Sequence, residues 1–365
     1  MKLTISTEAL KEMVSRAAKG VGNNKLLPIS SLMSIKTQNN KLVITTTNGY
    51  NFLYIKRDYE GEEFSITIEA DKFIKLIGKQ TCDKITMQVS DNALAIKGDG
   101  NYKIDIPVDP ATGEFIQYPD PMSEIELDEN ACKEINLSTI KEVINTCKAS
   151  LAVTMEDPSH TGYYVGEKVA TTNNLVATTM NAQLFSETVL VPSDYMDLLM
   201  VMTNEKIASY VVGDTIVCTS PDCVVYGTAM EELDEFPFEA IEELSNENMD
   251  SYCKVVKNSL LATLDRIALF VDVYDEDVVH FVFAKDGLHI SSVQSNGVEV
   301  VPYSGKDEVT PYECSLNVRV LVDEIKSYQP DEVLIYYGGD NSIKLVDGDT
   351  IFNIALIQNE GEEEE

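Results

Sequence analysis

The sequence predicts an α+β fold of three tandem copies of one strand-rich domain, each copy with two helices. One pattern, an alternating strand that runs into a short amphipathic helix, occurs three times, at residues 64–77, 187–199 and 312–325. Two hairpin turns rich in Asp, Asn, Ser and Gly follow each copy, because Asp, Asn and Gly tolerate the left-handed backbone of tight turns. Corresponding turn residues, Asp91, Asp214 and Asp340, lie 123 and 126 positions apart. A period of this length indicates a duplicated domain.

Each copy also opens alike, with a strand followed by a helix. In the first copy, Leu10, Met13 and Val14 fall on one face of the expected helix. In the second copy, Thr139 and Glu142 have the spacing of a capping box. Six helices are therefore expected, at residues 8–19, 71–79, 139–148, 193–203, 257–268 and 317–327.

Stretches rich in proline, glycine or acidic residues separate the copies, at residues 109–121 and 231–250. They place the predicted domains at residues 1–122, 123–245 and 246–359. The remaining residues, 360–365, are mostly Glu and are expected to form a disordered, solubilising tail.

The composition of the 365-residue chain favours a folded protein of the cytoplasm. The hydrophobic fraction is 44%, as in globular proteins, and no apolar stretch approaches the ~18 residues of a membrane span. The first residues lack the apolar core of a signal peptide and are expected to form a strand. Seven cysteines are scattered singly without a CxxC pair, which favours reduced thiols over disulfides or zinc. We expect no cofactor and no membrane partner.

The net charge of −33 by itself argues against binding a polyanion. The six expected helices, however, hold twelve basic and nine acidic residues, whereas the rest of the chain holds 16 basic and 52 acidic residues. Helix propensity alone would enrich Glu as much as Lys and Arg. A helix face turned towards phosphates, which carry no sequence information, explains the segregation better. The basic helix residues are Lys11, Arg16, Lys19, Lys72, Lys75, Lys79, Lys141, Lys148, Lys257, Arg266, Arg319 and Lys326.

Catalysis has little support in the sequence. His160, His280 and His289 stand apart without HExxH spacing, and no GxxxxGK[ST] loop is present. No Ser or Cys has the companions of a nucleophilic triad. The acidic loop at residues 272–277 lacks the order of EF-hand ligands and is expected to be solvated. We therefore expect no catalytic residue and no metal site.

These features together resemble the bacterial DNA polymerase III beta subunit, a DNA sliding clamp. Residues 1–5 (MKLTI), 27–29 (LPI) and 46–50 (TTNGY) are similar to the family's opening strand, LPI turn and TDG-type loop. Residues 170–177 (ATTNNLVA) occupy the place of its ATDGxRLA loop, and residues 316–325 resemble its FNVxYLxDxL helix entry. The resemblance spans essentially the whole chain, and the triplicated order is its most specific part.

The resemblance implies the DNA clamp fold and a non-enzymatic processivity factor. Two subunits would join head to tail, with sheets outside and twelve helices facing a central channel. Twelve helices about 10 Å wide need a circumference of about 120 Å, which leaves room for a duplex. Such a homodimer ring would encircle duplex DNA and tether DNA polymerase, with a clamp loader as a further partner. Loop residues Asn24 and Lys25 would join the DNA-facing set, and Leu269 and Phe270 would lie in the dimer contact.

The resemblance also implies a partner-peptide pocket between the second and third domains. Residue by residue, this pocket maps to His160, Thr171, Asn173, Asn174, Leu175, Val176, Leu244, Asn317, Val320, Ile354 and Leu356. The family's loop Asp-Gly is here Thr172-Asn173, its Arg is Leu175, and its Met-Pro-Met-Arg ending is absent. These departures predict a changed peptide specificity, as in a phage or mobile-element clamp with its own polymerase.

An acidic, non-catalytic interaction protein, such as a DNA mimic or a regulator-binding protein, is the competing hypothesis. The net charge of −33 fits a mimic. A mimic, however, has no reason to concentrate cations on six helices or to repeat three times.

Overall fold

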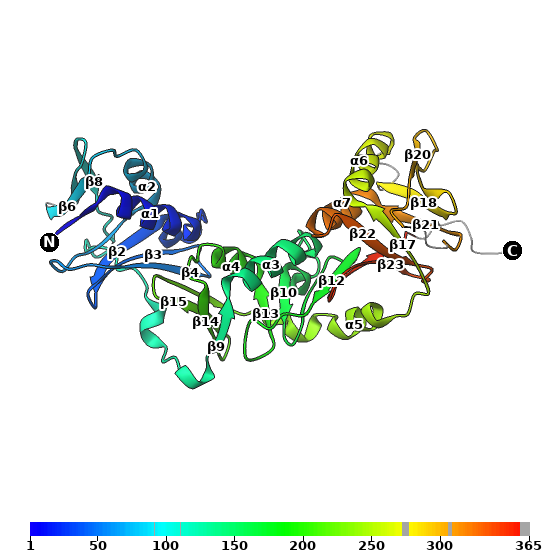
Figure 1. Ribbon diagram of the computed structural model, residues 1–365. Coiled ribbons are helices and arrows are strands. Elements are labelled where there is room, and N and C mark those ends of the chain that lie inside the picture. The colour runs from blue at the N-terminus through cyan, green and yellow to red at the C-terminus, as the bar shows by residue number, and fades with distance from the viewer. Residues whose placement is uncertain (91, 110, 272–276, 306–308, 358–365) are drawn as a thin grey trace. The chain divides into compact units, whose positions relative to one another are not determined.

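The computed structural model describes residues 1–90, 92–109, 111–271, 277–305 and 309–357 (Figure 1). Three times along the chain, one strand, one helix, four strands, a second helix and three strands follow in the same order. The predicted α+β class with two helices per copy is thus confirmed. The turn residue Asp91, residues 272–276 of the acidic loop, and the predicted tail lie outside the described residues.

The elements of the first copy are β1 (Lys2–Ser6), α1 (Thr7–Ala17), β2 (Leu32–Gln38), β3 (Lys41–Thr47), β4 (Phe52–Asp58), β5 (Ser65–Glu69), α2 (Ala70–Gly78), β6 (Lys84–Ser90), β7 (Ala93–Lys97) and β8 (Asn101–Asp105). Those of the second copy are β9 (Lys133–Asn136), α3 (Leu137–Cys147), β10 (Gly162–Val165), β11 (Val169–Thr172), β12 (Val176–Met180), β13 (Val189–Pro192), α4 (Ser193–Leu199), β14 (Lys206–Val212), β15 (Thr215–Ser220) and β16 (Cys223–Thr228).

A further helix, α5 (Phe238–Asn246), precedes the third copy. The elements of that copy are β17 (Ser251–Val256), α6 (Lys257–Ile267), β18 (Val278–Ala284), β19 (Gly287–Ser292), β20 (Val298–Val301), β21 (Tyr312–Asn317), α7 (Val318–Ser327), β22 (Glu332–Tyr337), β23 (Ser342–Asp347) and β24 (Thr350–Ala355).

The chain forms two compact units. Unit 1 comprises Met1–Ile140 with Asp194–Ala229, and unit 2 comprises Lys141–Ser193 with Met230–Glu365. The second copy is therefore shared between the units. The three predicted domains are a finer division, and their boundaries stay a prediction.

Each unit contains one four-stranded and one eight-stranded antiparallel sheet. In unit 1 the strand orders are β1-β6-β7-β8 and β5-β2-β3-β4-β16-β15-β14-β9. In unit 2 they are β20-β19-β18-β21 and β13-β10-β11-β12-β24-β23-β22-β17. The long sheets arise because the fourth strand of one copy pairs with the last strand of the next, as β4 with β16 and β12 with β24.

Amphipathic helices cover one face of each sheet. α1 begins after Ser6, whose hydroxyl accepts a hydrogen bond from the Ala9 amide at 3.3 Å, and it buries Leu10, Met13 and Val14. Capping satisfies an amide that has no partner inside the helix, and the buried stripe supplies most of the helix's stability. The apolar periodicity of the sequence therefore predicted α1 correctly.

Three details of the helix prediction are wrong. α3 begins at Leu137, so Thr139 lies inside the helix and does not cap it. α4 ends at Leu199, four residues early, because the next amides bond three residues back and tighten the chain into turns. The acidic stretch predicted as a linker contains α5, whose residues Phe238, Ile241 and Ser245 repeat at helical spacing against the sheet. The many Glu residues in this stretch of the sequence made the helical spacing difficult to recognise.

Candidate functional site

Basic side chains project from the solvent side of α1 and α2 in unit 1. Lys11 lies on α1 away from its buried stripe, and Lys19 follows the helix directly. α2 exposes Lys72 and Lys75, and Lys79 is exposed at its C-cap. Lys72 and Lys75 are paired with neighbouring acids, at 3.8 and 2.7 Å. In the described part of the chain, no ion pair engages Lys11, Lys19 or Lys79. These three cations are therefore available to an external anion.

The adjoining loop and α3 add further exposed cations. Lys25 is exposed, and the side-chain oxygen of Asn24 accepts a hydrogen bond from the Leu26 amide at 2.9 Å, which shapes the loop. Lys141, on α3, and Lys148, just after it, are also exposed. The sequence prediction and the structure thus agree that these side chains are accessible.

The predicted basic residues of the third copy are engaged within the protein. The Arg266 guanidinium bonds the Glu299 carboxylate at 2.7 and 2.5 Å. Arg319 pairs with Asp277 at 2.9 Å, and Lys326 lies 3.5 Å from a neighbouring acid. Lys257 donates hydrogen bonds to the carbonyls of residues 326 and 328. These partners reduce the positive field that this copy can present.

Arg16 has a structural role that the sequence did not indicate. Its side chain is 13% exposed, bonds the Asp222 carboxylate at 2.7 Å and donates to the Val201 carbonyl at 3.2 Å. Burial would raise the pKa of Asp222, but hydrogen bonds from Arg16, Thr203 and Ser220 outweigh burial and lower it. Arg16 joins α1 to the turn before β16, so it is poorly placed to meet a phosphate.

Leu269 and Phe270 are exposed apolar residues close to the start of the edge strand β20, on which Val298 and Val300 are also exposed. The first two follow α6 and are 81% and 53% exposed, and the valines lie on the edge strand β20. The Phe270 ring packs on Gly297, where an added Cβ would come within 2.9 Å of it. Large exposed apolar side chains close to an open strand edge are typical of a protein contact.

The predicted peptide pocket begins at the tight loop between β11 and β12 in unit 2. The Asn173 side-chain oxygen accepts hydrogen bonds from the amides of Leu175 and Val176, both at 3.0 Å. The Thr172 hydroxyl donates to the Val176 carbonyl at 2.8 Å, and Asn174 adopts a positive φ of 71°. This network holds Leu175 outward, with 43% of its surface exposed.

The first copy builds the same turn. Asn48 accepts from the amides of Tyr50 and Asn51 at 3.0 and 2.8 Å, and the Thr47 hydroxyl donates to the Asn51 carbonyl at 2.6 Å. The substitution of the family's Asp-Gly by Thr172-Asn173 therefore preserves a turn that the chain uses twice. What changes is the side chain that the turn presents, Leu175.

β24 pairs with β12 beside this loop and brings further residues of the predicted pocket close to it. Val176 lies opposite Ile354, and the Ala355 amide donates to the Leu175 carbonyl at 2.9 Å. Both Val176 and Ile354 belong to the core beneath α7, and Val320 and Leu356 pack against that core with part of their surface exposed. Strand pairing thus brings together residues from three distant parts of the sequence.

Asn317 and Thr171 hold the surrounding backbone. The Asn317 side chain caps α7 by accepting from the amides of Arg319 and Val320 at 3.0 and 3.1 Å. The buried Thr171 hydroxyl donates to the Cys147 carbonyl at 2.9 Å. Both residues act on the backbone and not on the pocket surface.

One predicted pocket residue, Leu244, lies on the other face of the sheet. Neighbouring Thr178 and Thr179 point to opposite faces, because the first bonds Ser150 on the α7 side and the second bonds Ser245 of α5 at 3.3 Å. α5, with the half-buried Leu244, therefore lies across the sheet from α7 (Figure 1). His160 is buried and contacts the Phe236 ring edge-on at 6.2 Å. It also lies 3.7 Å from Asp157, which accepts a hydrogen bond from the Asn174 side chain of the loop at 3.0 Å.

Lys344 positions α5 against the sheet. This buried lysine of β23 donates from Nζ to the Ser245 carbonyl at 3.2 Å and to the Glu247 carbonyl. Asn353 of β24 adds a hydrogen bond to the Ser245 hydroxyl at 2.8 Å. A cation at a helix C-terminus is favourable, so Lys344 caps α5 and fixes this side of the site.

Glu324 is the buried acid next to the pocket. It lies one turn after Val320 on α7, and Ser150 donates a hydrogen bond to its Oε1 at 3.0 Å. Its Oε2 is buried without a partner in the described residues. Burial raises the pKa of Glu324 to about 8. Its burial could have been inferred from the sequence, because Glu324 lies three residues after Leu321 on the apolar stripe of the helix. The charged residues around it obscured this position.

Other kinds of site receive no support from the described residues. No group of three or more His, Cys, Asp or Glu side chains there could hold a metal. No helix in the same part of the chain is long and apolar enough to cross a membrane. The seven cysteines, all within the described residues, form no disulfide with one another.

Comparison with known proteins supports the same fold. Residues 1–119 match the family model described as DNA polymerase III beta subunit, N-terminal domain. A search of curated proteins finds no relative of the sequence. Similar solved structures include the beta subunit from DNA polymerase of Streptococcus pyogenes, with a TM-score of 0.86, 16% identity, and coverage of 98% of this chain and 100% of that one. The DNA polymerase sliding clamp from Bacillus subtilis gives 0.84 and 15%, covering 98% and 99%.

The DNA polymerase III beta subunit from Thermotoga maritima gives a TM-score of 0.83 at 15% identity, again over 98% and 99% of the two chains. The fold is therefore that of the DNA sliding clamps over nearly the whole chain. The match to the family model covers the first copy of the domain, residues 1–119, and the likeness of fold extends over the whole chain.

The buried acid predicts a specific dependence of stability on pH. Because the folded protein holds the Glu324 proton more tightly than the unfolded chain, whose ordinary value is 4.5, this contribution is full below about 4.5 and lost as pH rises through about 8. Between these values the free energy of unfolding should fall by up to about 1.4 kcal/mol per pH unit. Glu324→Gln should flatten this slope and be more stable than the parent at pH 8, as measured by urea unfolding. Asp323→Asn, an exposed neighbour, is the control, and parallel parent and Gln profiles would contradict the assignment.

Proposed function

We propose that the protein is a sliding clamp that closes around duplex DNA as a head-to-tail homodimer and tethers a DNA polymerase. The observation that carries this proposal is the repeated way in which one copy joins the next. The match of residues 1–119 to the N-terminal domain of DNA polymerase III beta subunits and the sliding-clamp fold of the whole chain support the processivity role.

Two of three equivalent strand junctions are made within the chain. β16 pairs with β4 and β24 pairs with β12, in each case the last strand of a copy with the fourth strand of the preceding copy. The strands that remain for the third junction are β8 and β20, and both lie at the edge of a four-stranded sheet. Unpaired strand edges are templates for pairing with another chain. A second subunit that pairs its β8 with this β20, and its β20 with this β8, satisfies both edges.

Such a contact is head to tail. Two subunits joined in this way form a closed ring when the rotation between them also brings the second pair of strand edges together. The exposed Leu269 and Phe270 near the start of β20, and the exposed Val298 and Val300 on that strand, support this placement, because burial of apolar side chains would stabilise the contact. The assembled dimer would contain six copies of the domain.

The DNA contact follows from the accessible cations. Lys11, Lys19, Lys25, Lys79 and Lys141 are not ion-paired in the described residues and can neutralise phosphates without reading bases. The acidic remainder of the protein repels DNA from other surfaces. Weak contacts suffice, since topological linkage keeps a closed ring on its DNA. The protein would act in the cytoplasm, where a clamp loader opens the ring.

The partner site is the surface around Leu175, Val320 and Leu356, at the end of the sheet where β12 begins and β24 ends. Peptide recognition on such surfaces rests on a few aliphatic or aromatic anchors. Leu175 stands where the family pattern has an Arg. This part of the surface therefore carries an apolar side chain in place of a positive charge. The glutamates at 362–365 would disfavour acidic peptides and favour basic-flanked ones, an effect that fades with salt.

The ring predicts that Leu269→Asp with Phe270→Asp yields monomers, because the contact would then bury unpaired charge. Sedimentation equilibrium measures the mass of parent and variant. Val153→Asp with Met155→Asp is the matched control, since these apolar residues are at least as exposed and the charge change is equal. A variant that remains fully dimeric at the same concentration would show that the contact lies elsewhere.

Topological binding predicts retention on circular DNA and escape from linear DNA. Clamp loaded by its cognate loader onto a nicked circle should co-elute with the DNA in gel filtration and dissociate after a single restriction cut. Lys11→Glu with Lys19→Glu should shorten retention on the circle less than linearisation does. Tight binding to linear duplex at physiological salt would contradict the proposal.

The partner site predicts that Leu175→Asp with Val320→Asp lowers polymerase affinity at least tenfold while the dimer and circular dichroism stay unchanged. Val176 is unsuitable for this test, because it is 2% exposed and a charge there would disrupt the core. Met200→Asp with Val212→Asp, two exposed apolar residues of unit 1, is the matched control. Unchanged polymerase affinity, measured by biolayer interferometry, would require another site.

A further inference from the structure

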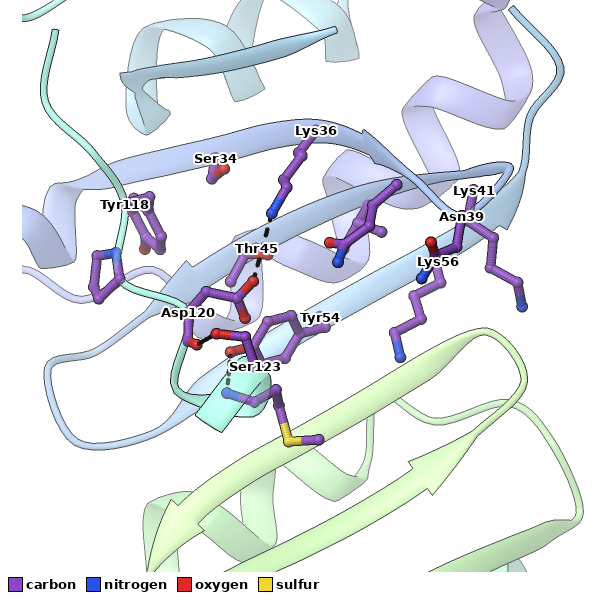
Figure 2. A pocket seen from close by; sticks show the side chains of 14 residues that line it. Ser34, Lys36, Asn39, Lys41, Thr45, Tyr54, Lys56, Tyr118, Asp120 and Ser123 are labelled. Carbon is purple, nitrogen blue, oxygen red and sulfur yellow. Dashed lines mark hydrogen bonds and ion pairs between the residues drawn. The ribbon is translucent and has the colours of Figure 1, made fainter. Parts of the chain in front are cut away.

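Unit 1 contains a polar cavity of about 260 Å³ that none of the sites above uses (Figure 2). Its floor is the face of β2, β3 and β4 that points away from α1. Ser34, Thr45 and Tyr54 form one cross-strand row of this floor. Residues 118–123 pass over one side of the cavity and leave the rest open.

Three lysines line this cavity against one carboxylate. Lys36 lies 3.6 Å from Asp120, and Lys41 donates to the Pro221 carbonyl at 3.1 Å and lies 3.9 Å from the exposed Asp58. The Lys56 ammonium has no hydrogen bond and no ion pair in the described residues. Burial and the nearby Lys41 lower the pKa of Lys56, as expected where positive charge is poorly compensated.

The second copy shows what covers the equivalent face. Thr46 and Thr171 correspond, because each hydroxyl donates to the carbonyl at the end of its copy's first helix. The residues before them, Thr45 and Ala170, lie opposite Ser34 and Tyr164 respectively. Tyr164 is therefore the counterpart of Ser34.

In the second copy this face is covered by an acidic, aromatic segment of the chain itself. The Phe238 ring stacks on Tyr164 at 4.2 Å with an angle of 11°, and the Lys168 ammonium pairs with Glu242 of α5 at 2.6 Å. Ile241, between them, is buried against the sheet. One aromatic ring and one carboxylate, four positions apart, thus cover the face.

In the first copy, Tyr118 and Asp120 reach only one side of this face, and no segment of the chain covers the side around Lys41 and Lys56 within the described residues. Serine replaces the tyrosine, which opens the space, and lysines at 36, 41 and 56 surround it. We propose that this cavity is a docking site for an acidic peptide segment of a partner protein, with a carboxylate between Lys36 and Lys56 and an aromatic ring over the half-exposed Val43. Hydrogen bonds between an ammonium and a carboxylate are stronger than those between neutral groups. In this cavity they would give an otherwise acidic protein a local preference for acidic partners.

The segment that covers the second copy supplies the probe. A fluorescein-labelled peptide with the sequence of residues 236–247 (FPFEAIEELSNE) is titrated with full-length protein and followed by anisotropy at 0.15 M salt. The parent protein should bind it saturably, and Lys36→Gln with Lys56→Gln should weaken binding about tenfold or more. The matched control is Lys84→Gln with Lys97→Gln, two exposed lysines of β6 and β7 with the same change in charge. A peptide with Gln at its first three Glu positions should also bind at least tenfold more weakly.

Several results would overturn the proposal. No saturable binding, or equal weakening by both lysine pairs, would exclude a peptide site in this cavity. Complete displacement of the peptide by a few millimolar inorganic phosphate would assign the cavity to small anions. Both lysine variants keep the dimer contact and the partner surface intact, so the outcome is independent of the proposed clamp function.

Discussion

The pairing of strands from successive copies is the constraint on which the rest of the structure depends. Backbone amides and carbonyls of a strand edge need partners, and β4 and β12 find theirs in the last strand of the following copy. Each pairing turns two four-stranded sheets into one sheet of eight. It also places Val176 beside Ile354, which are far apart in the sequence, and so creates the partner surface. The remaining edges, on β8 and β20, give the proposed subunit contact its location.

Buried polar groups fix the helices on these sheets. On one face, Glu324 bonds Ser150 beside Thr178, and on the other, Lys344 holds the end of α5. Burying such groups costs free energy unless each is paired. They therefore favour this arrangement of the helices over other arrangements, and add less to the total free energy of unfolding. Arg16 does the same in unit 1, where it bonds Asp222. Helix position, and with it the surface offered to a partner, is set by these few contacts.

The three copies differ in where their charged side chains lie. The chain is strongly acidic, yet the first copy keeps cations on α1 and α2 and in the cavity of β2–β4. In the third copy, equivalent cations such as Arg266 are neutralised by nearby acids. The copies share one backbone and have diverged in side chains. The same sheet face is open around Lys56 in the first copy and covered by Phe238 and Glu242 in the second.

The sequence by itself determined the fold class, the triplication and most helices, because apolar periodicity and turn residues are local properties that each copy repeats. Leu10, Met13 and Val14 of α1 are examples. Tertiary structure alone decided which basic residues are available, since Arg16 meets an acid more than two hundred positions away. It also decided that Leu244 and Val320 lie on opposite faces of one sheet. Such facts depend on long-range strand pairing, which no local pattern specifies.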